Sequence, residues 1–274
     1  MELNNSASCH LSIQVNLDGF SFAILNIQER KYIALECYDI QNCSTYNDLA
    51  EQIDKIIMQQ EMLQQNFTST SISIAHALNT LTPKVLYEDV NGKEILGFNQ
   101  SLLQNEKENS DWLNSIKAYN SYIIPEELER CFNKHFPNHI WKHDSSILIE
   151  SLLHQFKLQE GNQIYLSIQN TYFELIVLDG KKLKFFNNFA YKSASDLLYY
   201  LLFTCEQMGL NPDKIPLIIS GEIEKESEVY KSLYKYIRNI SFINRNPNYE
   251  YSFVFDEIKN HYYYKLLNQH LCVS

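Results

Sequence analysis

The feature that most restricts the fold of this chain is an order of secondary structure that occurs twice. Alternating apolar and polar residues predict a first strand at residues 11–17, and the Asp18–Gly19 pair after it predicts a hairpin turn. The chain continues into a second strand at 20–25. The rest of this first copy comprises a strand at 31–38, a helix with Leu49, Ile53 and Ile57 on one face, and a strand at 70–75.

The second copy has the same order. Strands are expected at 163–168, 172–178, 182–189 and 215–220. A helix lies between the last two and begins at Ser193 and Asp196, which have the spacing of a capping box. In a capping box each of the two side chains bonds the backbone N–H of the other residue.

Three consecutive strands, a helix and a further strand, present twice, indicate two related α/β halves. A simple α/β sheet would alternate single strands with helices instead. The layout resembles the duplicated actin-like (ribonuclease H-like) fold of the actin, sugar-kinase and heat-shock-chaperone ATPases. That resemblance implies two halves, each with a mixed five-stranded sheet and flanking helices, plus an inserted subdomain. We expect the first half at 1–77, the insertion at 78–144 and the second half at 145–274.

Three segments outside the repeat have patterns of their own. Residues 104–111 are all polar, which predicts an exposed loop. Residues 249–255 alternate like a half-buried edge strand. A final helix is expected over about 256–269, where Ile258, Tyr262 and Leu266 fall on one side.

Several short motifs resemble an uncharacterised Bacteroidetes family of domains of unknown function. They are Leu81–Lys84, Phe98–Asn99, Ser220–Ile223 and Leu271–Ser274. That family is similar in fold to the pilus-assembly and cell-division branches of the actin-like proteins. The resemblance implies a fold and no established activity.

Composition and charge narrow the class of partner. The net charge is −10 without any basic cluster, and an acidic chain repels both nucleic acid and anionic lipid surfaces. No apolar run is long enough to insert into a membrane, and the six cysteines lack any C-x-x-C spacing. We therefore expect a cytoplasmic protein with reduced thiols and a protein partner.

An actin-like ATPase needs phosphate-binding hairpins with glycines, and acidic side chains beside them for Mg²⁺. In the first hairpin Asn16 stands at the strand end where an acid is needed, and the single acid is Asp18, followed by Gly19. Asp18–Gly19 is interpreted as a turn pair rather than a metal site, since Asp179–Gly180 recurs elsewhere.

The other two ligand-facing turns lack the same chemistry. The second hairpin offers only the neutral Gln169 and Asn170, which cannot replace a carboxylate on Mg²⁺. After the strand at 215–220, Gly221 is followed by Glu222, whose side chain stands where a second glycine would admit a nucleotide base. The sequence therefore predicts no bound cofactor.

No other set of residues predicts a metal site or a catalytic site. His135, His139 and His143 are spaced four apart, but Pro137 interrupts the helix that would align them for a metal. A nuclease of this sheet layout would need an acid on the strand at 11–17, and it has none. We expect neither a metal site nor a catalytic residue.

The function predicted from these residues is a non-catalytic actin-like pseudo-ATPase that serves as a protein-interaction scaffold. The alternative is a divergent active ATPase or phosphotransferase that uses Asp18 and Gln169 in the cleft between the halves. The acidic excess lies entirely in residues 1–150, so a basic partner surface is expected to dock on 78–144. The acids assigned to that surface are Glu106, Glu108, Asp111, Glu126, Glu127 and Glu129.

Overall fold

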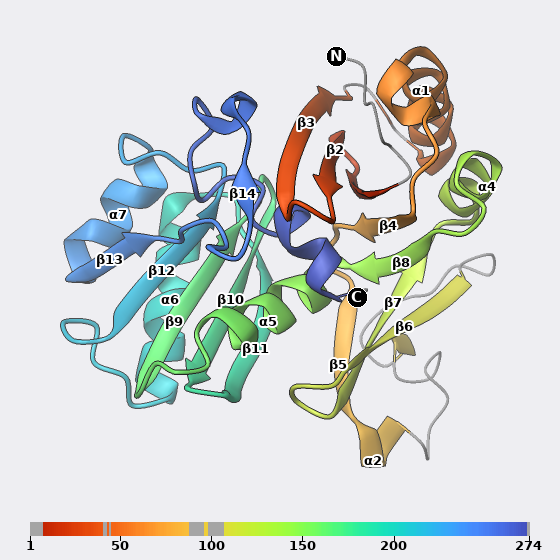
Figure 1. Ribbon diagram of the computed structural model, residues 1–274. Coiled ribbons are helices and arrows are strands. Elements are labelled where there is room, and N and C mark those ends of the chain that lie inside the picture. Colours follow the sequence, from red (N-terminus) through yellow and green to blue (C-terminus); the bar gives the residue numbers. More distant parts are fainter. Residues whose placement is uncertain (1–7, 41–42, 44, 88–95, 98–106, 273–274) are drawn as a thin grey trace. The chain divides into compact units, whose positions relative to one another are not determined.

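The computed structural model describes residues 8–40, 43, 45–87, 96–97 and 107–272 (Figure 1). The chain forms two compact units: unit 1 is Met1–Ile147, Pro247–Glu257 and Lys265–Ser274, and unit 2 is Leu148–Asn246 and Ile258–Tyr264. These units differ from the expected ranges because two C-terminal segments pack with the N-terminal unit.

The main sheet of unit 1 has the strand order β14-β3-β2-β1-β4-β8. Its strands are β1 (Cys9–Asn16), β2 (Gly19–Asn26), β3 (Lys31–Asp39), β4 (Ser69–Ile74), β8 (Ile140–His143) and β14 (Glu250–Tyr251). The first three strands are antiparallel, whereas β4 runs parallel to β1 and β8 runs parallel to β4. The meander and parallel strand that the sequence predicts are confirmed, and β8 extends the sheet.

Two helices cover the apolar face of this sheet. They are α1 (Tyr46–Gln59) and α4 (Glu126–His135), which lie side by side. Leu11, Ile13 and Val15 of β1 share one hydrophobic core with residues of both helices. Alternate residues of β1 therefore point toward the helices, as the period of two requires.

A second, smaller sheet in unit 1 comes from the expected insertion. Its strands have the order β5-β7-β6 and are all antiparallel. They are β5 (Asn79–Pro83), β6 (Lys107–Leu113) and β7 (Ala118–Ile124), and the short helix α2 (Lys84–Tyr87) follows β5. The prediction of an exposed loop at 104–111 is wrong for residues 107–111, because these residues pair with β7. Residues 104–106 lie outside the described residues.

The sheet of unit 2 has the order β11-β10-β9-β12-β13. Its strands are β9 (Asn162–Ile168), β10 (Tyr172–Asp179), β11 (Lys182–Ala190), β12 (Pro216–Gly221) and β13 (Asn239–Phe242). The helices are α5 (Asp144–Gln155), which begins in unit 1, α6 (Ala194–Gln207) and α7 (Glu228–Tyr236). The predicted capping box of Ser193 and Asp196 is confirmed at the start of α6.

The two main sheets repeat one strand order. Reading β3-β2-β1-β4-β8 against β11-β10-β9-β12-β13 gives the same meander, followed by two parallel strands. Unit 1 adds β14 at its edge. The α/β fold class with two duplicated halves is confirmed.

The C-terminal part of the chain is not the continuous helix that the sequence predicts. Residues Phe253–Phe255 and Leu266–Cys272 form 3₁₀ helices, and the expected strand at 249–255 shortens to the two residues of β14. One physical reason is that a backbone group of this segment pairs with another part of the chain. The carbonyl of Leu267 accepts a hydrogen bond from the Tyr32 hydroxyl at 2.7 Å. Among the helices that the structure describes, none has the length and apolarity needed to span a bilayer.

Candidate functional site

The first hairpin is built differently from the expected Asp18–Gly19 turn. Asn16 pairs with Gly19, so the turn residues are Leu17 and Asp18. The Asn16 Oδ1 atom accepts a hydrogen bond from the backbone N–H of Asp18 at 3.1 Å. The φ angle of Gly19 lies outside the left-handed region, and a Cβ there would meet the carbonyl oxygen of Tyr38 at 3.0 Å. This glycine therefore admits the neighbouring strand β3 and is not a turn glycine.

The second hairpin carries Gln169 and Asn170 in the turn between β9 and β10. The backbone N–H of Gln169 donates to the carbonyl of Tyr172 at 2.9 Å. The hydroxyl of Tyr191 donates to the carbonyl of Gln169 at 2.7 Å, which fixes the turn from the adjoining strand end. Asn170 is exposed. The turn therefore offers two neutral amides and no carboxylate.

Gly221 ends strand β12 and leaves no room for a side chain against strand β9. Its φ is +106°, and a Cβ there would lie 2.2 Å from the carbonyl oxygen of Ile168. Ile168 is the register partner of Gly221 and immediately precedes Gln169. The structure thus brings the second hairpin and the end of β12 together within unit 2. The first hairpin belongs to unit 1.

The backbone after β12 is covered by residues of the same unit. The N–H of Gly221 donates to the carbonyl of His261 at 3.0 Å, and His261 Nε2 donates to the carbonyl of Ile223 at 2.9 Å. The His261 ring stacks on Phe242 with a centroid distance of 4.0 Å. Burial lowers the pKa of His261, so the ring is uncharged at neutral pH. Glu222 is exposed. Two groups of His261 therefore hold the backbone of this turn, since its carbonyl accepts from Gly221 and its imidazole donates to Ile223.

A buried ion pair in unit 1 was not predicted from the sequence. Lys265 Nζ lies 2.9 Å from Asp144 Oδ2, and the two side chains are 5% and 0% exposed. The amide of Gln14, on β1, donates to the same carboxylate oxygen at 2.5 Å. Asp144 is the first residue of α5. The buried carboxylate that contacts β1 is therefore neutralised by a lysine from the C-terminal segment.

Gln269 bonds the polar face of β1 and β4 from the same segment. Its amide nitrogen donates to the carbonyl of Ile13 and to Ser73 Oγ, both at 2.8 Å. Its amide oxygen accepts from Ser71 Oγ at 2.8 Å. His10 Nε2 lies 2.9 Å from Ser71 Oγ. A face that alternation alone would assign to solvent is therefore buried and hydrogen-bonded.

The assignment of Asp111 to an acidic surface is wrong, because its side chain is buried. It is 3% exposed, accepts from the backbone N–H of His143 at 2.8 Å and from the Tyr122 hydroxyl at 3.2 Å, and lies 3.5 Å from Lys142 Nζ. Burial raises its pKa against the opposing effect of Lys142. Among the other acids assigned to this surface, Glu129 pairs with Lys107 and Glu126 with Arg130, and Glu106 lies outside the described residues.

Solved structures of other proteins share this fold. A Bacteroides thetaiotaomicron protein with an actin-like ATPase fold and unknown function is 21% identical, with a TM-score of 0.80 over 91% of this chain and 95% of that chain. A chain of the PilM–PilN type IV pilus biogenesis complex is 10% identical, with a TM-score of 0.63 over 98% and 99%. The ethanolamine utilization protein EutJ from Carboxydothermus hydrogenoformans is 6% identical, with a TM-score of 0.53 over 95% and 88%. The actin-like fold predicted from the strand order is confirmed.

The resemblance to a family of unknown function is also confirmed, although two of its motifs, Phe98–Asn99 and the end of Leu271–Ser274, fall outside the described residues. No curated protein matches this sequence. The family described as protein of unknown function (DUF3822) matches residues 1–240, and the chain belongs to that family.

Proposed function

We propose that this protein is a non-catalytic member of the actin-like fold, a pseudo-ATPase that acts as a scaffold for a protein partner. The observation that carries the first part is the ion pair of Asp144 and Lys265. Mg²⁺ in a nucleotide site is bound by carboxylates and phosphates. Here the buried carboxylate beside β1 already has an ammonium group as its counter-charge. A magnesium ion would have to displace that lysine and leave a buried cation unpaired, which is unfavourable.

The end of β12 supports the same proposal independently. Gly221 has no free backbone N–H for a ligand, because His261 accepts its hydrogen bond. The stacked rings of His261 and Phe242 pack beside this strand end, with a centroid distance of 4.0 Å. A buried carboxylate in unit 1 and a backbone N–H at the end of β12 in unit 2 are thus both satisfied by the protein itself.

The alternative enzyme would use Asp18 as its metal ligand, and a single substitution separates the two functions. Asp18→Asn leaves the turn intact, because the bond that shapes it runs from the backbone N–H of residue 18 to Asn16. Phosphate release from Mg-ATP should equal the buffer rate in both the wild type and Asp18→Asn, with Asp213→Asn, another exposed acid, as a matched control. Turnover that Asp18→Asn alone abolishes would establish the enzyme instead.

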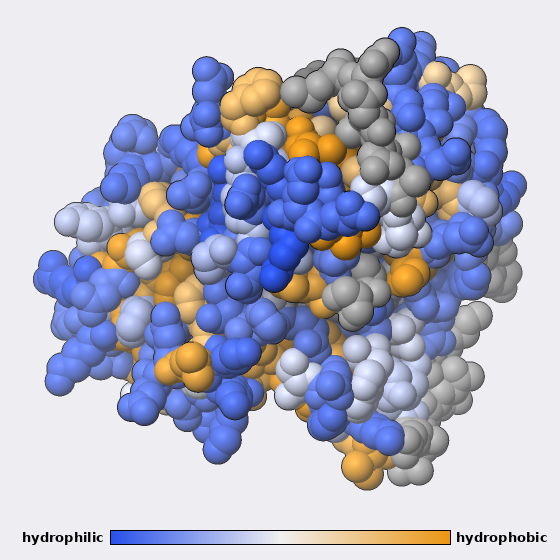
Figure 2. All heavy atoms as spheres, viewed as in Figure 1, coloured by the Kyte–Doolittle hydropathy of each residue, from blue (hydrophilic) through white to orange (hydrophobic). Residues whose placement is uncertain are grey.

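The scaffold part of the proposal draws on the exposed aromatic residues of α6. Tyr199 and Phe203 are 61% and 47% exposed, and their rings stack at 5.9 Å on one side of the helix. Exposed aromatic rings are over-represented where proteins bind one another. On the face that Figure 2 shows, hydrophobic surface forms separate patches among hydrophilic side chains. The likeness to a chain of the PilM–PilN complex fits a protein that binds another protein.

Co-purification from native extract tests this part. Wild-type protein should retain a partner that the double variant Tyr199→Asp/Phe203→Asp loses. Met58→Asp, at a position 58% exposed on α1, serves as the control and should retain it. Equal recovery of the partner by wild type and double variant would show that α6 is not the binding surface, and recovery of no partner by wild type would contradict the scaffold.

A further inference from the structure

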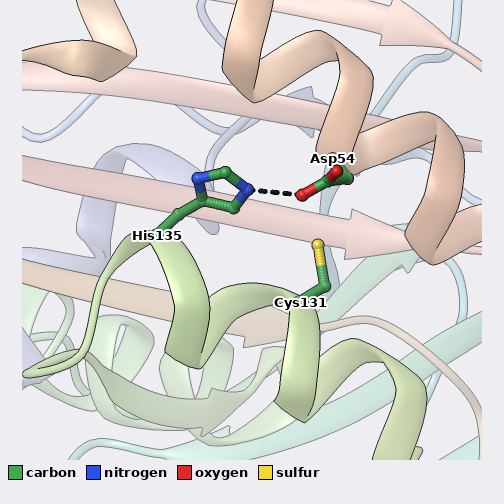
Figure 3. Close-up of side chains that lie close together, drawn as sticks. All are labelled: Asp54, Cys131 and His135. Carbon is green, nitrogen blue, oxygen red and sulfur yellow. Dashed lines mark hydrogen bonds and ion pairs between the residues drawn. The ribbon is translucent and has the colours of Figure 1, made fainter.

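The packing of α1 against α4 brings together three side chains with metal-binding atoms. Asp54 lies on α1, and Cys131 and His135 lie one turn apart on α4, so they share a helix face. Figure 3 shows the carboxylate, the thiol and the imidazole pointing toward one another from the two helices. No sequence motif indicates this set, because the spacing of His135, His139 and His143 points to a different, interrupted cluster.

The distances suit a transition metal after a small adjustment. One ligand atom from each residue lies within 4.8 Å of the other two, and His135 Nε2 lies 2.6 Å from Asp54 Oδ1. In a tetrahedral zinc site with bonds of about 2.0–2.3 Å, ligand atoms lie about 3.3–3.7 Å apart. Asp54 and His135 would need to separate slightly and Cys131 to approach, movements within the reach of side-chain rotation.

The surroundings provide access and a fourth ligand. Cys131 is 8% exposed, whereas Asp54 and His135 are half-buried. A neighbouring open pocket of about 320 Å³ is lined by Asp54, Cys131, Glu51 and Glu127, among others. A water molecule in this pocket can complete a tetrahedron. The thiol of the cluster therefore lines a pocket that is open to solvent.

A purely structural ion pair is the competing explanation of the cluster. Lys134 Nζ lies 2.7 Å from Asp54 Oδ1, and Lys134 and His135 together lower the pKa of Asp54. The Lys134 side chain is 57% exposed and can turn into solvent when a dication arrives. Burial, followed by the charge of Asp54, raises the pKa of Cys131 to about 11, so the thiol would release its proton on binding a metal ion.

From this geometry we propose that Asp54, Cys131 and His135 bind a zinc ion that ties α1 to α4. One thiolate, one imidazole and one carboxylate form a mixed ligand set that suits zinc, whereas magnesium and calcium prefer oxygen ligands alone. Because the ion would join two helices that share one hydrophobic core, binding should also stabilise unit 1.

Cobalt substitution tests the site directly. Tag-free protein, freed of metal with a chelator and then desalted, is titrated with Co²⁺ and followed by its thiolate-to-cobalt charge-transfer absorption. One equivalent should produce the band, zinc should abolish it, and zinc should raise the melting temperature. Cys131→Ser should remove the band, and Asp54→Asn and His135→Gln should each weaken binding at least about tenfold.

The control is Cys37→Ser, which removes an exposed thiol elsewhere in unit 1 and should leave the band unchanged. The proposal is overturned if the wild type gives no band, if Cys131→Ser retains it, or if Cys37→Ser loses it. Should Cys131→Ser fail to fold, the half-buried variants Asp54→Asn and His135→Gln decide. Zinc affinity unchanged in both would overturn the site, and weakened affinity in both would support it.

Discussion

Lys265 Nζ lies 2.9 Å from Asp144 Oδ2, and this pair joins the C-terminal segment of unit 1 to the start of α5. Both charges are withdrawn from solvent, so each depends on the other. The amide of Gln14 extends the contact to β1.

Removal of the lysine alone should destabilise the fold strongly. Lys265→Met leaves a buried carboxylate without its counter-charge, which costs about 3–5 kcal/mol of unfolding free energy. Adding Asp144→Asn removes the unpaired charge and keeps the acceptor for Gln14, so the double variant should recover more than half of the loss. Urea unfolding measures both.

The exposed pair of Lys184 and Asp179, 3.7 Å apart, supplies the control for that experiment. Lys184→Met should cost less than about 1 kcal/mol, because solvent screens the charges. If Lys265→Met lowers the unfolding free energy no more than Lys184→Met does, the buried ion pair does not stabilise the fold as proposed.

Gly221 should tolerate no side chain. Gly221→Ala puts a Cβ 2.2 Å from the carbonyl oxygen of Ile168 at a φ of +106°, so β9 and β12 must move apart. We expect a loss of about 3 kcal/mol or more, from overpacking and backbone strain together. Gly209→Ala is the matched control, since its φ is +65° and nothing lies within 4 Å of its Cβ. It should cost about 1–2 kcal/mol in chemical unfolding, and equal losses at both glycines would contradict the close approach.

Acid should destabilise the protein through His10. Burial, followed by the charge of His270, lowers the pKa of His10 from 6.5 to about 3. Because the folded pKa lies below the unfolded one, the contribution of His10 to stability is complete above pH 6.5 and declines as the pH falls toward 3. The slope from this group is about 1.4 kcal/mol per pH unit.

Unfolding free energies measured at several pH values below 6.5 check this expectation. His10→Gln keeps a hydrogen-bonding side chain beside Ser69 and Ser71 and should flatten the acid dependence. His154→Gln, at an exposed position, should leave the slope unchanged. An identical slope in wild type and His10→Gln would mean that His10 takes up its proton in the folded state.

Gln269 should contribute as much to the free energy of unfolding as a large core residue does. Gln269→Leu removes one buried hydrogen bond each from Ser71, Ser73 and the carbonyl of Ile13. A hydrogen bond contributes about 1 kcal/mol, so a loss of about 3 kcal/mol is expected in thermal or urea unfolding. Gln65→Leu, at an exposed residue, is the control, and similar losses in the two variants would show that the network is dispensable.

The repeated fold was predictable because its signals are local. Strand alternation and the capping box of Ser193 and Asp196 lie within short stretches of sequence, and both reappear in the structure. The turn at Leu17–Asp18 was misplaced because Asp-Gly is a frequent turn pair, whereas here Gly19 is needed for its small size beside Tyr38.

Most of the candidate site could not be predicted, because its contacts join residues far apart in the chain. The sequence around Asp144 does not predict its pairing with Lys265. The alternating pattern of β1 and β4 likewise does not predict that Gln269 covers their polar face. Asp111 looked like a surface acid for the same reason, since its partners Tyr122 and His143 come from other strands.

Calorimetric titration of the full chain with Mg-ATP tests the proposal that this actin-like protein has no working nucleotide site. No saturable heat is expected, with or without Mg²⁺, because Lys265 neutralises Asp144 and His261 accepts the hydrogen bond of the backbone N–H at the end of β12. Stoichiometric binding at micromolar affinity that requires Mg²⁺ would contradict it.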